Sequence, residues 1–305
     1  MIPALFLFPR ATPRRRLNSY PLFCGKLFLF FLCLSLGFPA CKTESNKKAA
    51  GTAEDIQFYQ EEIFIPLWDE EEAESMVPAG DEAPSLHVTL SLVGVSAEPG
   101  GKEESLDALL RDIFYRGMDL QDYAEEQIRL KTREYRDIRK EIRNQPDRIL
   151  SGTLNWYYDE DFRVEMNSPR FLVISRSWAD YTGGAHGNYG KNYFVFNRET
   201  ARRVLLSDII GEEFRQDLAE KINGELRKSR ELGGDDSLRQ SGFFVNQAEP
   251  TENFFLSPEG IGFHWDPYEI GPYSMGFVEV VVPYGEIGGI LKPLGRSAAR
   301  EAGSE

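Results

Sequence analysis

Cysteine is scarce in this chain of 305 residues, which contains only Cys24, Cys33 and Cys41. All three lie near the start, so the rest of the chain has no thiol for a disulfide, a thiolate nucleophile or a cysteine-ligated zinc site. Apolar runs of roughly twenty residues are also lacking, which excludes a protein with several membrane spans. The stability of the folded part must therefore come from packing.

Basic residues are too few to balance the acidic ones. The sequence has 35 Lys and Arg against 49 Asp and Glu, a formal net charge of −14. This balance argues against a nucleic-acid backbone as a partner and favours cationic partners. A hydrophobic content of 41% is high enough for one or two globular domains with a sizeable core.

The first forty residues have the order of a bacterial export signal. Residues 1–26 contain five basic residues and no acid, and residues 27–38 form an apolar run that is short for a permanent span. Cleavage after Ala40 would leave Cys41 as the new N-terminus. The pattern is similar to a lipoprotein signal, so we expect residues 1–40 to be removed and Cys41 to be acylated. An ordinary signal peptide and an uncleaved anchor are the alternatives.

The segment that follows is predicted to be a lipidated N-terminus and flexible tether, residues 41–54, because it is rich in Lys, Ser, Ala, Gly and Thr. Without the leader the chain keeps 30 basic and 49 acidic residues, a net charge of −19. We therefore expect an exported, membrane-anchored lipoprotein with an acidic domain that faces the periplasm or the cell exterior.

Residues 55–146 are expected to form an N-terminal half with strands and two helices. Alternating apolar residues predict strands over 57–68 and 85–97. Helical spacing predicts one helix that is capped by Ser105 and a second over residues 119–144. Mixed charges cover the second helix and indicate a solvated face.

Residues 147–291 are expected to form a C-terminal domain that begins with a meander of strands. Predicted strands over 152–158 and 162–167 flank an acidic hairpin turn, Asp159 to Asp161. Two more strands, over 170–181 and 188–196, flank a glycine-rich turn.

A helix follows around residues 214–226, then a hairpin over 253–265 and a last strand over 277–283. Residues 292–305 are predicted to be a disordered tail. Because strands and helices arrive in blocks, the predicted class is α+β, an antiparallel sheet meander with helices packed on one face.

Three stretches of the C-terminal domain have a distinctive sequence and spacing, residues 181–188, 196–208 and 254–273. Together they resemble a bacterial family of extracytoplasmic domains of undefined function. That family is shared by the ectodomain of the lysozyme-sensing anti-sigma factor RsiV and by accessory domains of PdaC-type peptidoglycan deacetylases. The resemblance covers about residues 149–291. It implies a non-catalytic α+β module of the cell envelope, like the RsiV ectodomain, that binds a protein or a glycan.

The three histidines, His87, His186 and His264, are not spaced like any compact metal-ligand motif, so we expect no metal and no other cofactor. His87 lies on the polar phase of a strand and is interpreted as a surface residue. His186 lies in the glycine-rich turn, where its imidazole can close the turn by hydrogen bonding or take part in recognition.

We expect the ligand-binding surface to combine the turn at residues 181–188 with the loop at 266–273, because glycines and aromatics there can form a rigid, partly apolar patch. The expected ligand is an extracytoplasmic cationic protein, with lysozyme as one example, or peptidoglycan. The predicted contact residues are Tyr181, Gly183, Gly184, His186, Asn188, Tyr268 and Tyr273.

The enzymatic alternative is a glycan hydrolase that acts on peptidoglycan through Asp266 and Glu269. Both acids lie beside aromatic residues, and an aromatic surround can raise the pKa of a carboxyl group. Pro267 and Pro272 instead indicate a rigid loop, so we expect no catalysis. A purely structural envelope lipoprotein is the third option.

Overall fold

The computed structural model describes residues 48–49, 55–69, 72–73, 83–101, 103–144, 154–233 and 236–303. All of these ranges lie in the unit Cys41–Glu305. The predictions for the leader, for Cys41 and for most of the tether therefore lie outside the described residues. No helix in the described ranges is both long enough and apolar enough to cross a bilayer.

A seven-stranded sheet runs through the molecule in chain order. Neighbouring strands of this sheet are antiparallel except for one parallel pair, β3 with β4. Helices α2 and α3 form the connection between these two strands. The α+β class and the mainly antiparallel meander are thus confirmed. The strands are β1 (Lys48–Ala49), β2 (Ile56–Pro66), β3 (Ser85–Val95), β4 (Trp156–Asn167), β5 (Phe171–Tyr181), β6 (Asn188–Asn197) and β7 (Arg202–Val204).

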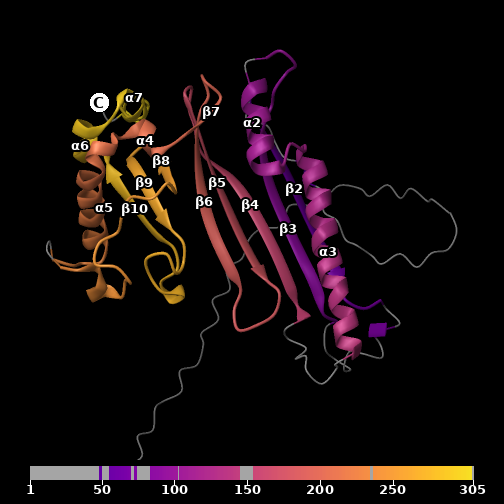
Figure 1. The fold of residues 1–305 in the computed structure, drawn as a ribbon. Coiled ribbons are helices and arrows are strands. Elements are labelled where there is room, and N and C mark those ends of the chain that lie inside the picture. The colour runs from indigo at the N-terminus through magenta and orange to yellow at the C-terminus, as the bar shows by residue number, and fades with distance from the viewer. Residues whose placement is uncertain are drawn as a thin grey trace, which may run out of the picture. The chain divides into compact units, whose positions relative to one another are not determined.

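Helices α2 (Glu104–Tyr115) and α3 (Leu120–Asn144) cover one face of this sheet (Figure 1). Asp119 caps α3, since its carboxylate accepts the backbone N–H of Asp122 at 2.8 Å. The predicted cap at Ser105 is wrong, because the residue that precedes α2 is Glu103 and Ser105 lies inside the helix.

The other face carries a three-stranded antiparallel sheet, in the order β10-β9-β8, with helix α5 (Arg215–Ser229) beyond it (Figure 1). Its strands are β8 (Phe254–Leu256), β9 (Gly260–Trp265) and β10 (Val278–Pro283). The first residues of strand β5 are apolar on both faces because they lie between the two layers. Phe171 and Val173 join the core of the C-terminal layer, whereas Leu172 and Ile174 join the core under α2 and α3.

The boundary predicted at residues 146–147 falls between two strands of one sheet, because β3 pairs with β4. The two predicted halves therefore share a continuous middle layer. Short helical elements complete the C-terminal layer: α4 (Leu206–Ile209), η3 (Glu212–Phe214), η4 (Leu238–Ser241), η5 (Tyr273–Met275), α6 (Tyr284–Ile287) and η6 (Gly288–Ile290).

The tail predicted to be disordered instead contains helix α7 (Pro293–Glu301). Ala298 and Ala299 are buried in the core of the C-terminal layer, and Arg170 donates to the Ser297 hydroxyl at 2.7 Å. The packing is close, since a Cβ on Gly295 would lie 2.7 Å from the backbone oxygen of Ile209. Small side chains make this contact, so the segment has no conspicuous apolar stripe in its sequence.

The acidic turn predicted at Asp159 to Asp161 is also wrong, because the three residues lie inside β4. Glu160 is 1% exposed, and its carboxylate accepts hydrogen bonds from Arg176 at 2.7 Å and from the Tyr123 hydroxyl at 3.0 Å. A buried carboxylate is tolerated in a strand when it is paired and hydrogen-bonded in this way.

Candidate functional site

The two segments predicted to form a binding surface lie against each other. The Tyr273 hydroxyl donates to the backbone oxygen of Gly187 at 2.9 Å. The His186 ring stacks on the Tyr273 ring, with centroids 4.3 Å apart and planes 30° apart. We call residues 181–189 and 266–277 together the loop surface.

The first segment of the loop surface connects β5 to β6. Gly183 and Gly184 have φ of 96° and 109°, a region that suits glycine. The Tyr181 hydroxyl donates to the backbone oxygen of Gly184 at 3.0 Å, and His186 Nδ1 lies 2.8 Å from the oxygen of Gly187. His186 is exposed, as is Asn188, the first residue of β6. The turn is therefore held by its own hydrogen bonds and presents its side chains outward.

The second segment follows β9 and leads to β10. Tyr268 has a φ of 73°, which is uncommon for a residue other than glycine, and its side chain is 59% exposed. Its backbone N–H donates to the oxygen of Gly271 at 2.9 Å. Behind the turn, the backbone N–H of Phe244 donates to the oxygen of Ile270 at 2.8 Å. A fixed turn thus holds the Tyr268 ring in solvent.

An aromatic cluster joins the two segments. The Tyr273 ring lies 5.3 Å from Tyr189 and 5.9 Å from Tyr268, and Tyr189 lies 5.1 Å edge-on from Phe277, which is 39% exposed. Such ring pairs stabilise the fold beyond the hydrophobic free energy gained by burying the rings. Sequence reasoning missed Tyr189 and Phe277, although the alternation of β6 places Tyr189 and Tyr193 on one side of that strand.

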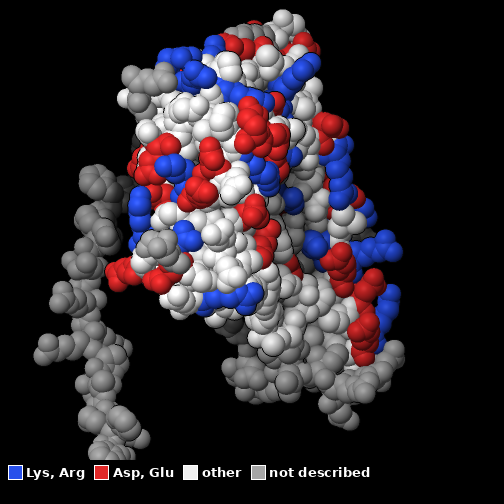
Figure 2. Space-filling model, turned by 60° about the vertical axis from the view of Figure 1, so that its left-hand side comes forward, with Lys and Arg blue, Asp and Glu red and all other residues white. Residues whose placement is uncertain are grey.

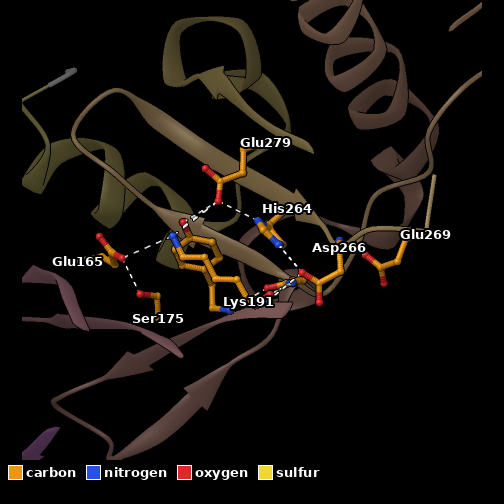
Figure 3. A network of polar contacts seen from close by, with 9 residues as sticks. Glu165, Ser175, Lys191, His264, Asp266, Glu269 and Glu279 are labelled. Atoms are coloured by element: carbon orange, nitrogen blue, oxygen red, sulfur yellow. Dashed lines mark hydrogen bonds and ion pairs between the residues drawn. The ribbon is translucent and has the colours of Figure 1, made fainter. Parts of the chain in front are cut away.

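A buried histidine, His264, lies beside Phe277 of this cluster; Figure 3 shows its polar partners. His264 is fully buried on β9, 4.8 Å from the ring of Phe277. Its Nδ1 lies 2.8 Å from Glu279 Oε1, and its Nε2 lies 2.8 Å from Asp266 Oδ1. The same oxygen of Asp266 accepts the backbone N–H of Lys191 at 2.9 Å.

Two carboxylates flank the His264 ring and favour its protonated, positively charged form. Burial lowers the pKa of His264, but the hydrogen bonds to Asp266 and Glu279 raise it, and the net direction is upward. The hydrogen bond from His264 holds the pKa of Glu279 below its usual value despite burial. Only the imidazolium can donate from both ring nitrogens, so the charged form satisfies both contacts.

The network continues from the small sheet to the large one (Figure 3). Lys191 Nζ lies 3.7 Å from Glu279 Oε1 and 3.8 Å from Glu165 Oε1, and the buried Ser175 hydroxyl donates to Glu165 at 2.6 Å. The Tyr193 hydroxyl donates to Glu279 at 2.9 Å. The network therefore ties β4, β5 and β6 to β9 and β10.

The carboxylates considered for catalysis, Asp266 and Glu269, lie three residues apart in one turn. The backbone N–H of Asp266 donates to Glu269 Oε2 at 2.7 Å, and Asp266 Oδ1 already accepts hydrogen bonds from His264 and Lys191. This arrangement positions the turn. In the described part of the chain, no group of three or more His, Cys, Asp or Glu residues is placed to hold a metal ion.

The fold and the loop surface define an α+β domain with a rigid aromatic surface at one end of its two sheets. Residues 195–285 match a family that is described as a protein of unknown function, DUF3298. This match covers the second segment of the loop surface and the His264 network on β9 and β10. A family of undefined function, as the sequence predicted, is thus confirmed for this region.

Solved structures of two DUF3298 proteins are among those similar to this chain. A DUF3298 family member from Bacteroides fragilis has a TM-score of 0.68 at 21% sequence identity, and the alignment covers 87% of this chain and 98% of that protein. A DUF3298 family protein from Pseudomonas aeruginosa has a TM-score of 0.49 at 16% identity, with 82% and 94% covered. The first of these shows the fold. No curated protein matches the sequence.

Proposed function

We propose that this protein is an exported lipoprotein, anchored through Cys41, which binds a cationic extracytoplasmic protein at the loop surface and performs no chemistry. The observation that carries the proposal is the contact between the two segments. The Tyr273–Gly187 hydrogen bond and the His186–Tyr273 stack unite them into one fixed aromatic surface. Rigid aromatics on loops are typical of recognition sites.

Charge favours a cationic partner. Residues 181–189 and 266–277 contain two carboxylates, Asp266 and Glu269, and neither Lys nor Arg. Acidic and basic side chains are interspersed over the face drawn in Figure 2. The net negative charge therefore acts on a partner as a long-range electrostatic field and not through one local acidic patch. Such a field speeds the encounter with a basic protein and weakens as salt is added.

The hydrogen bonding around Asp266 supports binding without catalysis. Asp266 Oδ1 accepts hydrogen bonds from His264 and from the backbone N–H of Lys191, contacts that give this carboxylate a positioning role. His264 has a carboxylate at each ring nitrogen and has no free nitrogen to act as a base.

The resemblance to the RsiV ectodomain makes lysozyme the first partner to test. The resemblance to accessory domains of peptidoglycan deacetylases makes a cell-wall glycan the second. The exposed ring of Tyr268 favours this second candidate, because a sugar can stack on it while Glu269 and Asn188 supply polar contacts. The hydrolase that would use Asp266 and Glu269 is the third outcome of the tests.

Calorimetric titration of the full chain with lysozyme, at low and moderate salt, tests the binding proposal. We expect Tyr268→Ala to weaken binding about 5- to 30-fold, the range that corresponds to loss of one interface anchor. Phe58→Ala is the matched control, because Phe58 is 38% exposed and lies on β2. Absence of heat at every salt concentration would remove lysozyme as the partner.

Turnover of peptidoglycan fragments that is lost in Asp266→Asn and Glu269→Gln would instead support the hydrolase. The anchor is tested separately by metabolic labelling with a fatty-acid probe, comparing the unaltered chain with Cys41→Ser. We expect label only in the unaltered chain. An unlabelled chain would contradict the lipoprotein proposal without affecting the binding proposal.

A further inference from the structure

A row of rings crosses the large sheet beside the loop surface. Phe64 on β2 is the register partner of His87 on β3, His87 pairs with Tyr157 on β4, and Tyr157 pairs with Tyr181 on β5. Register partners point to the same face of a sheet. We call these four residues the aromatic row. With strands about 4.8 Å apart, it is about 14 Å long.

The rings of the row stack in pairs. Phe64 and His87 have centroids 4.1 Å apart and planes 11° apart, and Tyr157 and Tyr181 lie 6.2 Å apart at 22°. Neighbouring residues on these strands, Ile63 and Leu86 among them, belong to the core under α2 and α3. The aromatic row therefore occupies the opposite face, where period-two alternation normally places polar residues.

The aromatic row is continuous with the loop surface. Tyr181 belongs to both, and Tyr157 packs under the turn so closely that a Cβ on Gly187 would lie 2.5 Å from the Tyr157 hydroxyl. A scattered exposed aromatic residue is ordinary, but a contiguous apolar strip that leads out of a recognition surface indicates an interface.

Phe64 is the most exposed member of the aromatic row. It is 45% exposed, although its ring stacks on His87 with centroids 4.1 Å apart. The exposed part of the Phe64 ring is available to a ligand.

Carboxylates flank the row. The adjacent row of register partners contains Glu62, Thr89 and Asp159. Glu62 is hydrogen-bonded to His87 at 2.8 Å, and Asp159 makes no ion pair within the described residues. These two rows contain neither Lys nor Arg. An aromatic face beside a carboxylate suits a guanidinium or ammonium group, through cation–π attraction and a charge-assisted hydrogen bond.

The size of the loop surface indicates that a protein partner reaches further. Nine residues of the loop surface are exposed, whereas a standard protein interface takes about 20–30 residues from each side. We infer that a cationic protein bound at the loop surface also covers the aromatic row, where its Arg or Lys side chains contact Phe64 beside Glu62. This inference rests on the proposed function and adds a second contact region, outside the residues that match DUF3298.

The test titrates the full chain with lysozyme as the cationic probe and compares three variants by calorimetry. Phe64→Ser removes the exposed ring, and Tyr268→Ala removes the loop contact. Phe58→Ser is the matched control, because Phe58 lies on the same strand with similar exposure, six residues or about 20 Å away. Equal melting temperatures of the two β2 variants show that any difference between them reflects binding.

We expect Phe64→Ser to weaken binding about 5- to 30-fold and Phe58→Ser to change it less than twofold. If Tyr268→Ala weakens binding while Phe64→Ser and Phe58→Ser behave alike, the interface does not extend beyond the loop surface. That result overturns the inference and leaves the proposed function in place. Absence of binding by the unaltered chain overturns both. If the chain binds peptidoglycan fragments in a Phe64-dependent way and does not bind lysozyme, the ligand of the aromatic row is a glycan and the inferred cationic protein is wrong.

A charge reversal gives an independent readout. Asp159→Lys introduces a cation beside Tyr157 without removing an ion pair of the described residues. We expect it to slow association with lysozyme at low salt, with the difference shrinking as salt is added. An association rate equal to that of the unaltered chain at low salt would argue that the partner does not pass over this face.

Discussion

His264 and Asp266 are joined by a hydrogen bond of 2.8 Å between Nε2 and Oδ1. Asp266 begins the second segment of the loop surface, and the same oxygen accepts the backbone N–H of Lys191 on β6. The first residue of this segment is thus fixed to both sheets at one atom. The charge of a fully buried imidazole therefore helps to set the position of the exposed turn that Asp266 begins.

The stability of the protein should fall as the pH rises above neutrality. The pKa of His264 in the folded state lies above its ordinary value of 6.5, so its contribution is complete below about pH 6.5 and is lost as the pH passes the folded-state pKa. The pKa of Glu279 is lowered from 4.5, so its contribution is present above about pH 4.5 and is lost in acid. We expect maximal melting temperature between these values in a series from pH 4 to 9.

His264→Gln is the variant that isolates this effect. An amide carries no charge at any pH, so the decline between about pH 6.5 and 9 should flatten. His87→Gln is the control, because the His87 side chain is 32% exposed and lies outside the His264 network, so the decline should remain. An equal decline in His264→Gln and in the unaltered chain would contradict the assignment.

Tyr273→Phe should loosen the contact between the two loop segments. The variant removes the hydroxyl that donates to Gly187 and keeps the ring that stacks on His186. We expect a loss of about 1 kcal/mol in the free energy of unfolding, measured from urea midpoints. Tyr189→Phe is the matched control, because Tyr189 lies in the same cluster and no hydrogen bond of its hydroxyl is described. Equal midpoints would indicate that solvent satisfies both hydroxyls.

Glu160→Ala should be far more damaging than Asp161→Ala, although the residues are adjacent. Removal of Glu160 leaves the Arg176 guanidinium half-buried without its partner, at a cost of about 3–5 kcal/mol. Asp161 pairs with the exposed Arg163 at 2.5 Å, and such a pair contributes about 0–1 kcal/mol. Denaturant unfolding distinguishes the two. Small and equal losses would fit a solvated acidic turn, which the sequence predicted.

That acidic run shows what the sequence could not reveal. Three consecutive carboxylates are typical of a turn, and the compensating Arg176 lies on the next strand, so only the pairing of β4 with β5 explains Glu160. Helix α7 was missed for a related reason, because Gly295 and Ala298 pack through their small size and leave no apolar periodicity. Strands with clean alternation, such as β3, were predicted within two residues at each end.

The candidate site was predictable in part. The glycines and aromatics of residues 181–188 and 266–273 indicated turns, and the structure brings those turns together. The His264–Glu279 contact was hidden, since the two residues are register partners across β9 and β10 but twelve residues separate these strands. The aromatic row was equally hidden, because it needs the parallel pairing of β3 with β4, which follows a long helical connection.

Gly187→Ala should disturb the point where the aromatic row meets the loop surface. A Cβ at this position would lie 2.5 Å from the Tyr157 hydroxyl and 2.8 Å from the backbone oxygen of Asp180. Overpacking of this kind costs about 1–3 kcal/mol. Gly285→Ala is the control, because a Cβ on Gly285 in α6 meets no atom within 4 Å, so little or no stability should be lost.

A double variant separates the two clashes at Gly187. Tyr157→Phe removes the nearer oxygen, so Gly187→Ala should cost less in a Tyr157→Phe background than alone. The rescue should be partial, since the backbone oxygen of Asp180 cannot move out of β5 as a side chain can. Urea unfolding of the four chains gives the coupling energy. If the losses of unfolding free energy in the two single variants add up to the loss in the double variant, the turn shifts away from Tyr157 as a unit. If Gly187→Ala costs no stability in the Tyr157→Phe background, the contact with the Asp180 oxygen relaxes at no cost.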